Sequence, residues 1–541
     1  MKVRRAALLY ITFLLFFFLI VCRLYLLATD KTFAARAHNQ TVTTLQLETN
    51  RGDFYDAAGE KLTGNEPIWY ALCIPGEESY ARLFHCVDYE TQNLLYQRRN
   101  AAVPFLVPVE RDLSEEGIYT YLGTRRYARQ AVCAHLLGYL NDAGEGVTGL
   151  EAAFEEYLAQ PEPPDHLQCV TNAQGKLMDE TEPVLLSQQT EECGVQLTIS
   201  KPIQRACEGI ASAMMTSGCI LVLETDSAKV RASVSCPFYH PDRVAKSIAA
   251  NDGSLVDRVF RAYSVGSVFK PVLAAAALEE GLGAFTIECK GYVDRSGQIY
   301  RCAGGIAHGS VTLQTALEKS CNCYFIELGD RLGAERLWDY ADRFGFGQPV
   351  YLARGMRSAA GNLPDIKTLQ NSGQRANFSF GQGELLAAPL QLAAMMNVIA
   401  SGGLYRMPAF LERTVQADPF TGELTTKEQL YEPLQQRIIG ERSASALQHM
   451  LQQVVLQGTG SAAQPIHGDA AGKTGTAQTG RFDEAGSEYQ DLWFVGFYPA
   501  QQPRYTIVVM QDAQLQAEHS SAAIFSSVCD ALYWLEQPAE A

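Results

Sequence analysis

Basic residues are scarce in this 541-residue chain, which has 44 lysines and arginines against 60 aspartates and glutamates. The formal net charge of −16 at pH 7 argues against nucleic acid as the main partner, because phosphate binding requires a basic surface. Apolar residues make up 47% of the chain and charged residues 19%, which is typical of globular domains. A chain of this length is expected to form two or three domains.

Two binding signatures are absent as well. None of the 14 cysteines belongs to a C-x-x-C pair, which argues against a zinc site and predicts no metal. Cys289 and Cys302 could form a disulfide across a hairpin, and most of the other cysteines are expected to be small buried apolar residues. Gly472 and Lys473 look like the end of a phosphate-binding loop, but Gly468 lies one residue too close for that motif, so no nucleotide site is predicted.

One long apolar run is present at the N-terminus. Ala6 to Cys22 contains 17 residues without a charge, and the apolar character continues to residue 28, which predicts a transmembrane helix over 6–28. The basic tail of residues 1–5 should stay in the cytoplasm and place the rest of the chain outside. The alternative is a cleaved signal peptide, but the run is long for one and no A-x-A site follows it directly. The sequence therefore predicts a single-pass protein of the cell membrane.

In the remaining chain, the pattern of predicted strands and helices changes near residue 196. Residues 29–195 mix strand-like pieces with turns, include a more helical stretch over 112–137, and contain no catalytic constellation. After residue 196, hairpins are predicted at 218–235 and 491–512, with helices between them. The predicted helices cover residues 267–281, 389–403 and 444–460. This order favours an α+β fold, in which helices pack against an antiparallel sheet.

The first candidate for chemistry is Ser267-Val268-Phe269-Lys270, the only S-x-x-K in the chain. Residues three apart share one face of a helix, so the hydroxyl and the amine can meet. The free N–H groups and positive end of the helix dipole favour a developing alkoxide. A serine activated by a neutral lysine is a known variant of the nucleophile and base pair.

Two further short motifs follow in the chain. Ser320-Cys321-Asn322 ends a helix-like run, where a loop-borne hydroxyl and amide could relay a proton and hold a peptide carbonyl. Lys473-Thr474-Gly475 is expected on a strand edge, where the lysine and threonine could bind a carboxylate and Gly475 permits close backbone approach. Three weak motifs in this order form the set typical of penicillin-binding proteins and β-lactamases.

Longer stretches extend the similarity. "YSVGSVFKP" is similar to the family's Y-x-P-G-S-x-x-K-P with Val265 in place of proline, and "FSFGQGELLAAPLQLAAMMNVIASGG", "AGKTGTAQ" and "WFVGFYP" match later stretches. "RGDFYDAAGEKL" and "GVTGLEAAFEEYL" are similar to two stretches of the N-terminal pedestal, with Ala57 replacing an arginine and Thr148 a serine. The chain thus resembles a class B penicillin-binding protein over nearly its whole length. The resemblance implies a dimerisation-type pedestal over 29–195 and a transpeptidase domain over 196–535.

The resemblance also implies a reaction. Ser267 would attack the carbonyl of a peptidoglycan stem peptide ending in D-Ala-D-Ala, and Lys270 would accept its proton. Burial and the neighbouring Lys473 should lower the pKa of Lys270 for this task. Ser320 would relay the proton to the departing D-alanine, and Asn322 would orient the peptide and Lys270. An amine from a second stem peptide would then close the crosslink.

Substrate binding is implied in the same way. Lys473, Thr474 and Thr476 would bind the terminal carboxylate beside Gly475, and the N–H groups of Ser267 and Thr476 would form the oxyanion hole. β-Lactam antibiotics would mimic the donor and leave Ser267 acylated. No metal or organic cofactor is implied, and His308 is expected to be structural. A membrane glycan polymerase of the shape, division or sporulation family is the protein partner that the resemblance suggests.

Rival activities remain to be separated. A D,D-carboxypeptidase would use the same residues with water as acceptor. A class A β-lactamase needs an E-x-x-x-N loop after the S-x-N motif, which is missing between Asn322 and Lys473. A bifunctional synthase needs a glycosyltransferase domain, for which residues 29–195 are too short. The non-enzymatic alternative is a scaffold in a wall-building complex.

Overall fold

The computed structural model describes residues 2–29, 42–47, 51–74, 78–101, 103–159, 165–171, 177, 182–187, 192–295 and 297–537. The chain forms two compact units that interleave along the sequence. The first unit comprises residues 1–51, 64–126 and 160–190, and the second comprises 52–63, 127–159 and 191–541. The predicted domain limits of 29–195 and 196–535 stay predictions, since two segments before residue 160 pack with the second unit.

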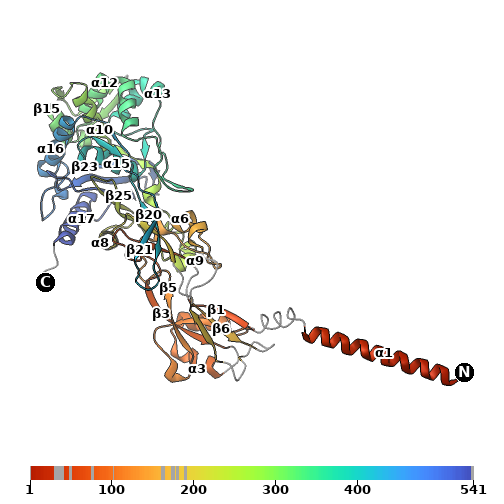
Figure 1. Cartoon of the computed structure of the whole chain (residues 1–541). Coiled ribbons are helices and arrows are strands. Elements are labelled where there is room, and N and C mark those ends of the chain that lie inside the picture. Colours follow the sequence, from red (N-terminus) through yellow and green to blue (C-terminus); the bar gives the residue numbers. More distant parts are fainter. Residues whose placement is uncertain are drawn as a thin grey trace. The chain divides into compact units, whose positions relative to one another are not determined.

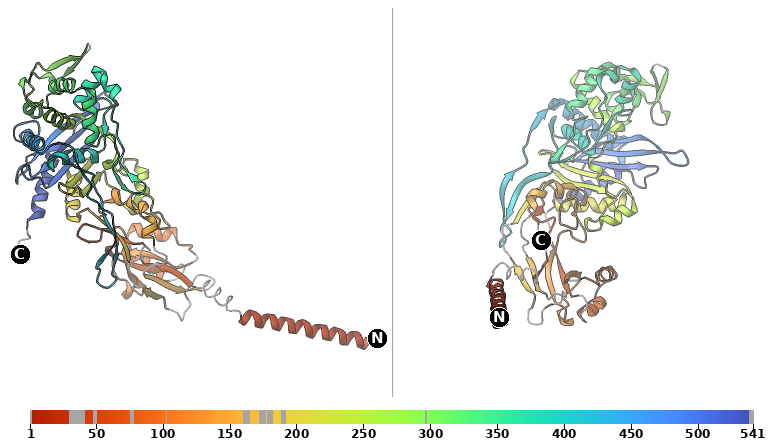
Figure 2. Two further views of the ribbon diagram at one scale, coloured as in Figure 1. Left: turned by 45° about the horizontal axis from the view of Figure 1, so that its top comes forward. Right: turned by 90° about the vertical axis from the view of Figure 1, so that its right-hand side faces the viewer.

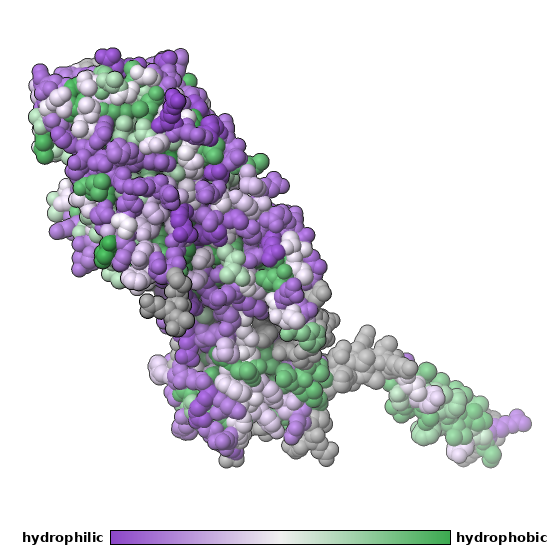
Figure 3. Space-filling model, turned by 60° about the vertical axis from the view of Figure 1, so that its left-hand side comes forward, coloured by the Kyte–Doolittle hydropathy of each residue, from purple (hydrophilic) through white to green (hydrophobic). Residues whose placement is uncertain are grey.

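Helix α1 spans Lys2–Thr29 and contains the predicted transmembrane segment. The most apolar 18-residue window within Val3–Thr29 has a mean hydropathy of 2.5, and none of the helix's described residues is buried. Figure 3 shows an almost continuous apolar surface along this helix, with hydrophilic residues at its N-terminal end. By length and composition the helix can cross a membrane.

Beyond α1, the described part of the first unit contains two three-stranded sheets and the α-helices α3 (Glu78–Cys86) and α4 (Tyr89–Gln97) (Figure 1). One sheet has the order β1 (Val42–Gln46), β6 (Asp165–Val170), β7 (Val184–Ser187), and the other β4 (Phe105–Val109), β3 (Glu66–Cys73), β5 (Thr120–Arg125). Helices α3 and α4 follow β3 in the chain. The helical prediction over 112–137 is wrong for most of its length, because β5 forms there and pairs antiparallel with β3, and only Ser114–Glu116 and Ala134–Leu137 are helical.

A five-stranded antiparallel sheet forms the centre of the second unit. Its order is β10 (Val230–Cys236), β9 (Gly218–Glu224), β25 (Tyr505–Gln514), β24 (Glu488–Tyr498), β23 (Ala471–Phe482). The two predicted hairpins are present as β9–β10 and β24–β25. Figure 2 shows β23, β24 and β25 side by side in blue in both views. Because β23 is an edge strand, one side of its backbone is not paired in this sheet.

Helices cover both faces of this sheet, since alternate strand residues belong to two different hydrophobic clusters. Ile220, Val509 and Phe494 pack with α8 (Lys201–Met214) and α17 (Ser521–Glu536). Residues of the opposite parity, such as Leu221 and Val508, pack with the larger cluster of α10 (Lys270–Glu279), α15 (Pro389–Ala400) and α16 (Glu441–Gln457). Figure 1 shows these two groups of helices on either side of the strands. The predicted α+β class is confirmed.

Smaller elements complete the second unit. A four-stranded sheet has the order β2 (Asp53–Tyr55), β8 (Glu192–Leu197), β20 (Leu411–Ala417), β21 (Leu424–Gln429). The two-stranded ladders are β11 (Tyr263–Ser264) with β18 (Leu386–Ala387), β12 (Ile287–Cys289) with β15 (Gly309–Val311), β13 (Tyr292–Arg295) with β14 (Gln298–Arg301), β16 (Tyr351–Ala353) with β17 (Met356–Arg357), and β19 (Leu404–Arg406) with β22 (Gln435–Arg437). The other α-helices are α5 (Ala134–Leu137), α6 (Gly149–Ala153), α7 (Glu155–Leu158), α9 (Val244–Ala250), α11 (Leu313–Glu318), α12 (Asn322–Arg343), α13 (Ile366–Gln370) and α14 (Ser372–Ser379).

Candidate active site

Ser267 lies in a 3₁₀ turn, η4 (Gly266–Phe269), that leads directly into α10. Gly266 has a φ of +65° and donates its N–H to the carbonyl oxygen of Gly381 at 2.7 Å. A Cβ on Gly381 would lie 1.9 Å from the carbonyl oxygen of Gly266, so only glycine permits this approach. The contact holds the turn that presents the half-buried Ser267 side chain.

The same turn packs on the edge strand β23. A Cβ on Gly475 would lie 2.8 Å from Cγ1 of Val268, and a Cβ on Gly266 would lie 2.8 Å from the carbonyl oxygen of Thr476. Side chains alternate along this part of β23, so that Lys473 is buried whereas Thr476 is exposed. The backbone of Gly475 and Thr476 is therefore held directly against the turn that carries Ser267.

This approach gives a test of the packing. Gly475→Ala should destabilise the protein by about 1–3 kcal/mol, because the new methyl group overlaps Val268 in a closely packed region. Thermal unfolding of the purified chain, followed by intrinsic fluorescence, would measure the shift. Gly209→Ala is the matched control, since its Cβ on α8 would meet nothing within 4 Å. Equal melting temperatures for Gly475→Ala and the wild type would contradict the close approach.

The Lys270 side chain is completely buried at the start of α10. Its Nζ donates to the carbonyl oxygen of Ser320 at 2.8 Å, to Oδ1 of Asn322 at 2.7 Å and to Oγ of Ser320 at 3.1 Å. The ring of Phe325 lies beneath it, with its centroid 5.5 Å from Nζ. These contacts join the first motif to the second.

Lys473 reaches the same serine from β23. It is also completely buried, and its Nζ donates to Oγ of Ser320 at 3.1 Å and to the carbonyl oxygen of Thr474 at 3.1 Å. The hydroxyl of Thr474 lies 3.0 Å from the hydroxyl of Thr459. All three motifs therefore meet at the side chain of Ser320.

Two buried amines at one hydroxyl cannot both carry a full charge at low cost, because neither has a carboxylate in this network. Burial lowers the pKa of Lys270 to about 7. Burial, with repulsion from Lys270, lowers the pKa of Lys473 well below its usual range. A neutral amine is thus accessible near neutral pH, as a proton acceptor requires.

Ser320 has an unusual backbone conformation. Its φ is +49°, in the left-handed region that residues other than glycine rarely adopt. The residue lies between α11 and α12, and Asn322 is the first residue of α12. The Asn322 amide also donates to the carbonyl oxygen of Arg301 at 2.9 Å, which fixes its orientation. Strain of this kind gathers at functional sites, where the surrounding structure maintains it.

The structure brings the predicted site residues together in two ways. Lys270, Ser320, Asn322, Lys473 and Thr474 form one hydrogen-bonded network. The remaining three, which are Ser267, Gly475 and Thr476, join it through the packing of η4 on β23. The Ser267 hydroxyl makes no hydrogen bond to any residue that the structure describes, and the chemical roles of all eight residues stay predictions.

Two neighbouring residues were not predicted from the sequence. Thr459 contacts Thr474 as described above, and Nε2 of Gln382 lies 3.4 Å from the carbonyl oxygen of Thr476. Gln382 lies in a stretch that carries the family resemblance and Thr459 lies between Gly458 and Gly460, but single polar residues in glycine-rich loops give no signal of their own. Cys289 and Cys302, which could have formed a disulfide, are free thiols in this structure.

Comparison with known proteins identifies the family of this chain. Residues 218–530 match the family described as penicillin binding protein transpeptidase domain. Stage V sporulation protein D of Bacillus subtilis is 26% identical over 501 residues, which cover 86% of this chain and 75% of that protein. Peptidoglycan D,D-transpeptidase FtsI of Escherichia coli K12 is 24% identical over 528 residues, which cover 90% and 83%.

Solved structures share the fold. Penicillin-binding protein 3 of Mycobacterium tuberculosis, complexed with aztreonam, superposes with a TM-score of 0.64 at 22% sequence identity. The alignment covers 92% of this chain and 97% of that one. The D,D-transpeptidase domain of a peptidoglycan glycosyltransferase from Eggerthella lenta superposes with a TM-score of 0.63 and covers 90% of this chain.

Proposed function

Because this chain belongs to the penicillin-binding protein transpeptidase family, we propose that it is a class B D,D-transpeptidase that crosslinks peptidoglycan stem peptides. The family match covers more than half of the chain, and a relative that aligns with 90% of it is named a peptidoglycan D,D-transpeptidase. One observation carries the proposal: Lys270 and Lys473, both completely buried, converge on the hydroxyl of Ser320 beside the turn of Ser267. This arrangement provides a base and a proton relay next to a nucleophile.

In the first step, Oγ of Ser267 attacks the carbonyl carbon between the two terminal D-alanines of a donor stem peptide. The hydroxyl proton passes to the neutral amine of Lys270, and a C–O bond forms. The tetrahedral intermediate then collapses as its C–N bond breaks. The proton returns through Ser320 to the leaving nitrogen, so D-alanine departs as an amine and Ser267 stays acylated.

In the second step, an amine from another stem peptide attacks the acyl-enzyme. Lys270 takes a proton from this amine and returns it to Oγ of Ser267 as the ester bond breaks. The new amide is the crosslink, and the enzyme regains its starting protonation state. Asn322 keeps Lys270 in place throughout, because its amide is anchored on one side by Arg301 and on the other by Nζ.

Substrate binding uses the edge strand. The donor peptide lies along the unpaired side of β23, where its terminal carboxylate meets Lys473, Thr474 and Thr476. The backbone N–H groups of Ser267 and Thr476, which the packing of η4 on β23 brings close, stabilise the oxyanion by about 3 kcal/mol each. Gly475 leaves room for this approach. A β-lactam occupies the same place and acylates Ser267.

The N-terminal helix anchors the enzyme in the cell membrane. The basic residues at its start favour a cytoplasmic N-terminus, so the transpeptidase region faces the cell wall outside. A membrane glycan polymerase is the partner that this arrangement suits, because new glycan strands and their crosslinks are needed at the same place.

The rate of acylation by a fluorescent penicillin should rise with pH through about 7 and level off above it. The pKa of Lys270 is about 7, and below that value its amine carries a proton and cannot accept another. Second-order labelling rates of the full chain between about pH 5.5 and 9 would give the profile. Circular dichroism at each pH is the control for folding. A rate that rises only near the ordinary lysine pKa would contradict a base tuned by burial.

The time course of the same label separates the rival activities. Label that persists for hours on the full chain supports a slow-deacylating transpeptidase site, whereas rapid loss would support a β-lactamase. Incubation with a D-Ala-D-Ala peptide and an acceptor amine then separates crosslinking from carboxypeptidase activity by product mass. A folded chain that never takes up label would support a scaffold role.

A further inference from the structure

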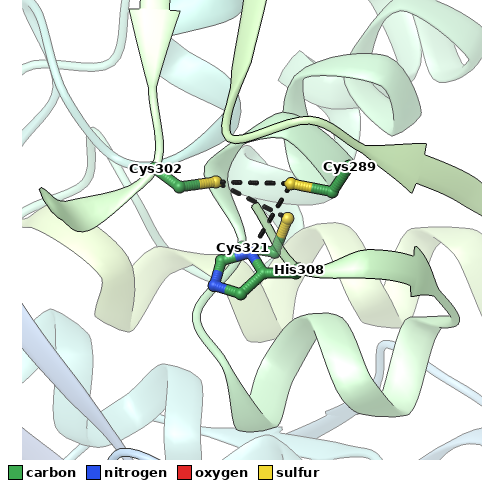
Figure 4. Close-up of side chains that lie close together, drawn as sticks. All are labelled: Cys289, Cys302, His308 and Cys321. Atoms are coloured by element: carbon green, nitrogen blue, oxygen red, sulfur yellow. Dashed lines mark hydrogen bonds between the residues drawn. The ribbon is translucent and has the colours of Figure 1, made fainter. Parts of the chain in front are cut away.

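Three cysteines and a histidine gather beside the S-x-N turn, at a place where the mechanism does not use them. Cys289 ends β12, Cys302 follows β14, His308 precedes β15, and Cys321 lies between Ser320 and Asn322. Their sulfur and nitrogen atoms all lie within 4.8 Å of one another. Figure 4 shows the four side chains pointing toward a common centre from separate segments.

Three of the six separations have the values expected around one tetrahedral metal ion, and the others are no longer than 4.8 Å. Sγ of Cys302 lies 3.8 Å from Sγ of Cys289 and 3.7 Å from Sγ of Cys321, and Nδ1 of His308 lies 3.5 Å from Sγ of Cys289. Around a tetrahedral zinc ion, bonds of about 2.3 Å to sulfur and 2.0 Å to nitrogen place two sulfurs about 3.8 Å apart, and sulfur and nitrogen about 3.5 Å apart. A disulfide would need sulfurs about 2.05 Å apart.

The backbone around the cluster supports thiolate ligands. The N–H of Gly291 points to Sγ of Cys289 at 3.4 Å, and the N–H of Cys302 donates to the carbonyl oxygen of Gly291 at 3.0 Å. Gly291 has a φ of +84°, and a Cβ there would lie 2.4 Å from the carbonyl oxygen of Gly305. N–H groups aimed at sulfur orient metal ligands and stabilise their negative charge.

The segments that carry the four residues are short. β12, β13, β14 and β15 have three or four residues each and form only two-stranded ladders. Ladders of this size are marginal on their own, and these two gain support from packing against the neighbouring hydrophobic clusters. A metal ion would add a crosslink and tie three separate segments to the turn that holds Ser320.

We propose that Cys289, Cys302, His308 and Cys321 bind one Zn²⁺ ion that fixes the S-x-N turn. Three thiolates and a neutral imidazole are a common ligand set of structural zinc sites. Binding converts three thiols to thiolates and releases three protons, which leaves the site with a net charge of −1.

The expectation of no metal rested on the missing C-x-x-C pair. The ligands instead follow the spacing C-x₁₂-C-x₅-H-x₁₂-C, which resembles no common zinc motif in the sequence. The fold decides their proximity, because the antiparallel pairing of β12 with β15 and of β13 with β14 returns the chain to the same place twice.

The effect that the metal ion should have on acylation rests on the proposed function. Cys321 separates Ser320 from Asn322, so a metal bond to its sulfur holds the strained backbone that presents both residues to Lys270. The four ligands are positioning residues for this purpose. Loss of the ion should slow acylation by about tenfold to a hundredfold, a range typical of lost orientation around a reacting group.

The test is the metal content of the full chain. Protein purified in detergent without a histidine tag, under reductant and with added Zn²⁺, should contain about one zinc ion per chain by mass spectrometry. Co²⁺ in place of zinc should give the intense near-ultraviolet absorption of thiolate-to-cobalt charge transfer. Cys302→Ser and His308→Ala should each lose most of the metal. Cys86→Ser, which alters an exposed cysteine outside the cluster, should keep it.

A second measurement uses only the wild type, so its result does not depend on whether the variants fold. Adding Zn²⁺ to chelated wild-type chain should raise its melting temperature, because an ion that binds only the folded state stabilises it. Cys323→Ser is a close control, since this sulfur lies 3.5 Å from that of Cys302 but outside the set of four. It should keep the metal and the shift.

Several results would overturn the proposal. They are folded wild type without zinc after loading, cobalt absorption without charge transfer, unchanged metal content in Cys302→Ser, or a Cys289–Cys302 disulfide in protein kept reduced. Penicillin labelling reports separately on the proposed function. Zinc binding without penicillin labelling would support the zinc site and contradict the proposed transpeptidase activity. Labelling without zinc binding would support the activity and contradict the zinc site.

Discussion

Ser267→Ala should abolish covalent labelling of the full chain by a fluorescent penicillin. The expected loss in acylation rate is at least about 10⁴-fold, because removing the nucleophile of a serine acyl-transfer site eliminates the covalent path. The substitution should leave the fold intact, since the half-buried Ser267 side chain makes no hydrogen bond to any residue in the described part of the chain. Gel fluorescence after incubation with the probe, with intact mass as a second readout, would measure it.

Ser264→Ala is the matched control for this loss. Ser264 is also half-buried and lies three residues earlier in β11, where its backbone carbonyl, which the substitution retains, accepts a hydrogen bond from Trp493. Its label should match that of the wild type. Equal labelling of Ser267→Ala and the wild type would move the nucleophile elsewhere and remove the basis of the proposed reaction.

Lys270→Met should slow acylation by about 10²- to 10⁴-fold, the usual contribution of a positioned general base. Methionine has a similar length and suits a completely buried site, but it cannot accept the proton of Ser267. The residual rate should also lose its inflection near pH 7, because the group with a pKa of about 7 is gone. Stopped-flow or gel-based rates across the pH range would give both results.

Lys319→Met controls for a general effect of removing a lysine from this region. Lys319 is exposed and directly precedes Ser320, so its replacement should change the acylation rate by less than about twofold. Circular dichroism of Lys270→Met is needed beside it, because the change leaves Oδ1 of Asn322 without its lysine donor. A folded Lys270→Met with the wild-type rate would assign the base to Lys473.

The two predicted hairpins and three predicted helices of the second unit form, and local reasons explain why. Their apolar runs have the period of the element that they form, and glycines such as Gly281 and Gly402 follow the helices α10 and α15. The prediction of a helix over 112–137 fails because of a long-range contact. There β5 owes its existence to pairing with β3, some 50 residues earlier in the chain, which overrides a local helical tendency.

Some features of the candidate site can likewise be predicted from the sequence, whereas others depend on the fold. The order and type of Ser267, Lys270, Ser320, Asn322 and Lys473 are enough to indicate acyl-transfer chemistry, because three motifs that are each weak form a specific set in this order. The left-handed backbone of Ser320 and the contact of Thr459 with Thr474 depend on segments that fold from far apart. No local pattern encodes them.

By itself, then, the sequence determined the long apolar N-terminal helix, the α+β class and the three motifs, since composition, periodicity and short spacing are local properties. Only the tertiary structure decided that both lysines are buried at one hydroxyl, which lowers the pKa of each. It also decided that Cys289, Cys302, His308 and Cys321 converge. Burial and convergence arise from contacts between distant segments, so they exist only once the chain has folded.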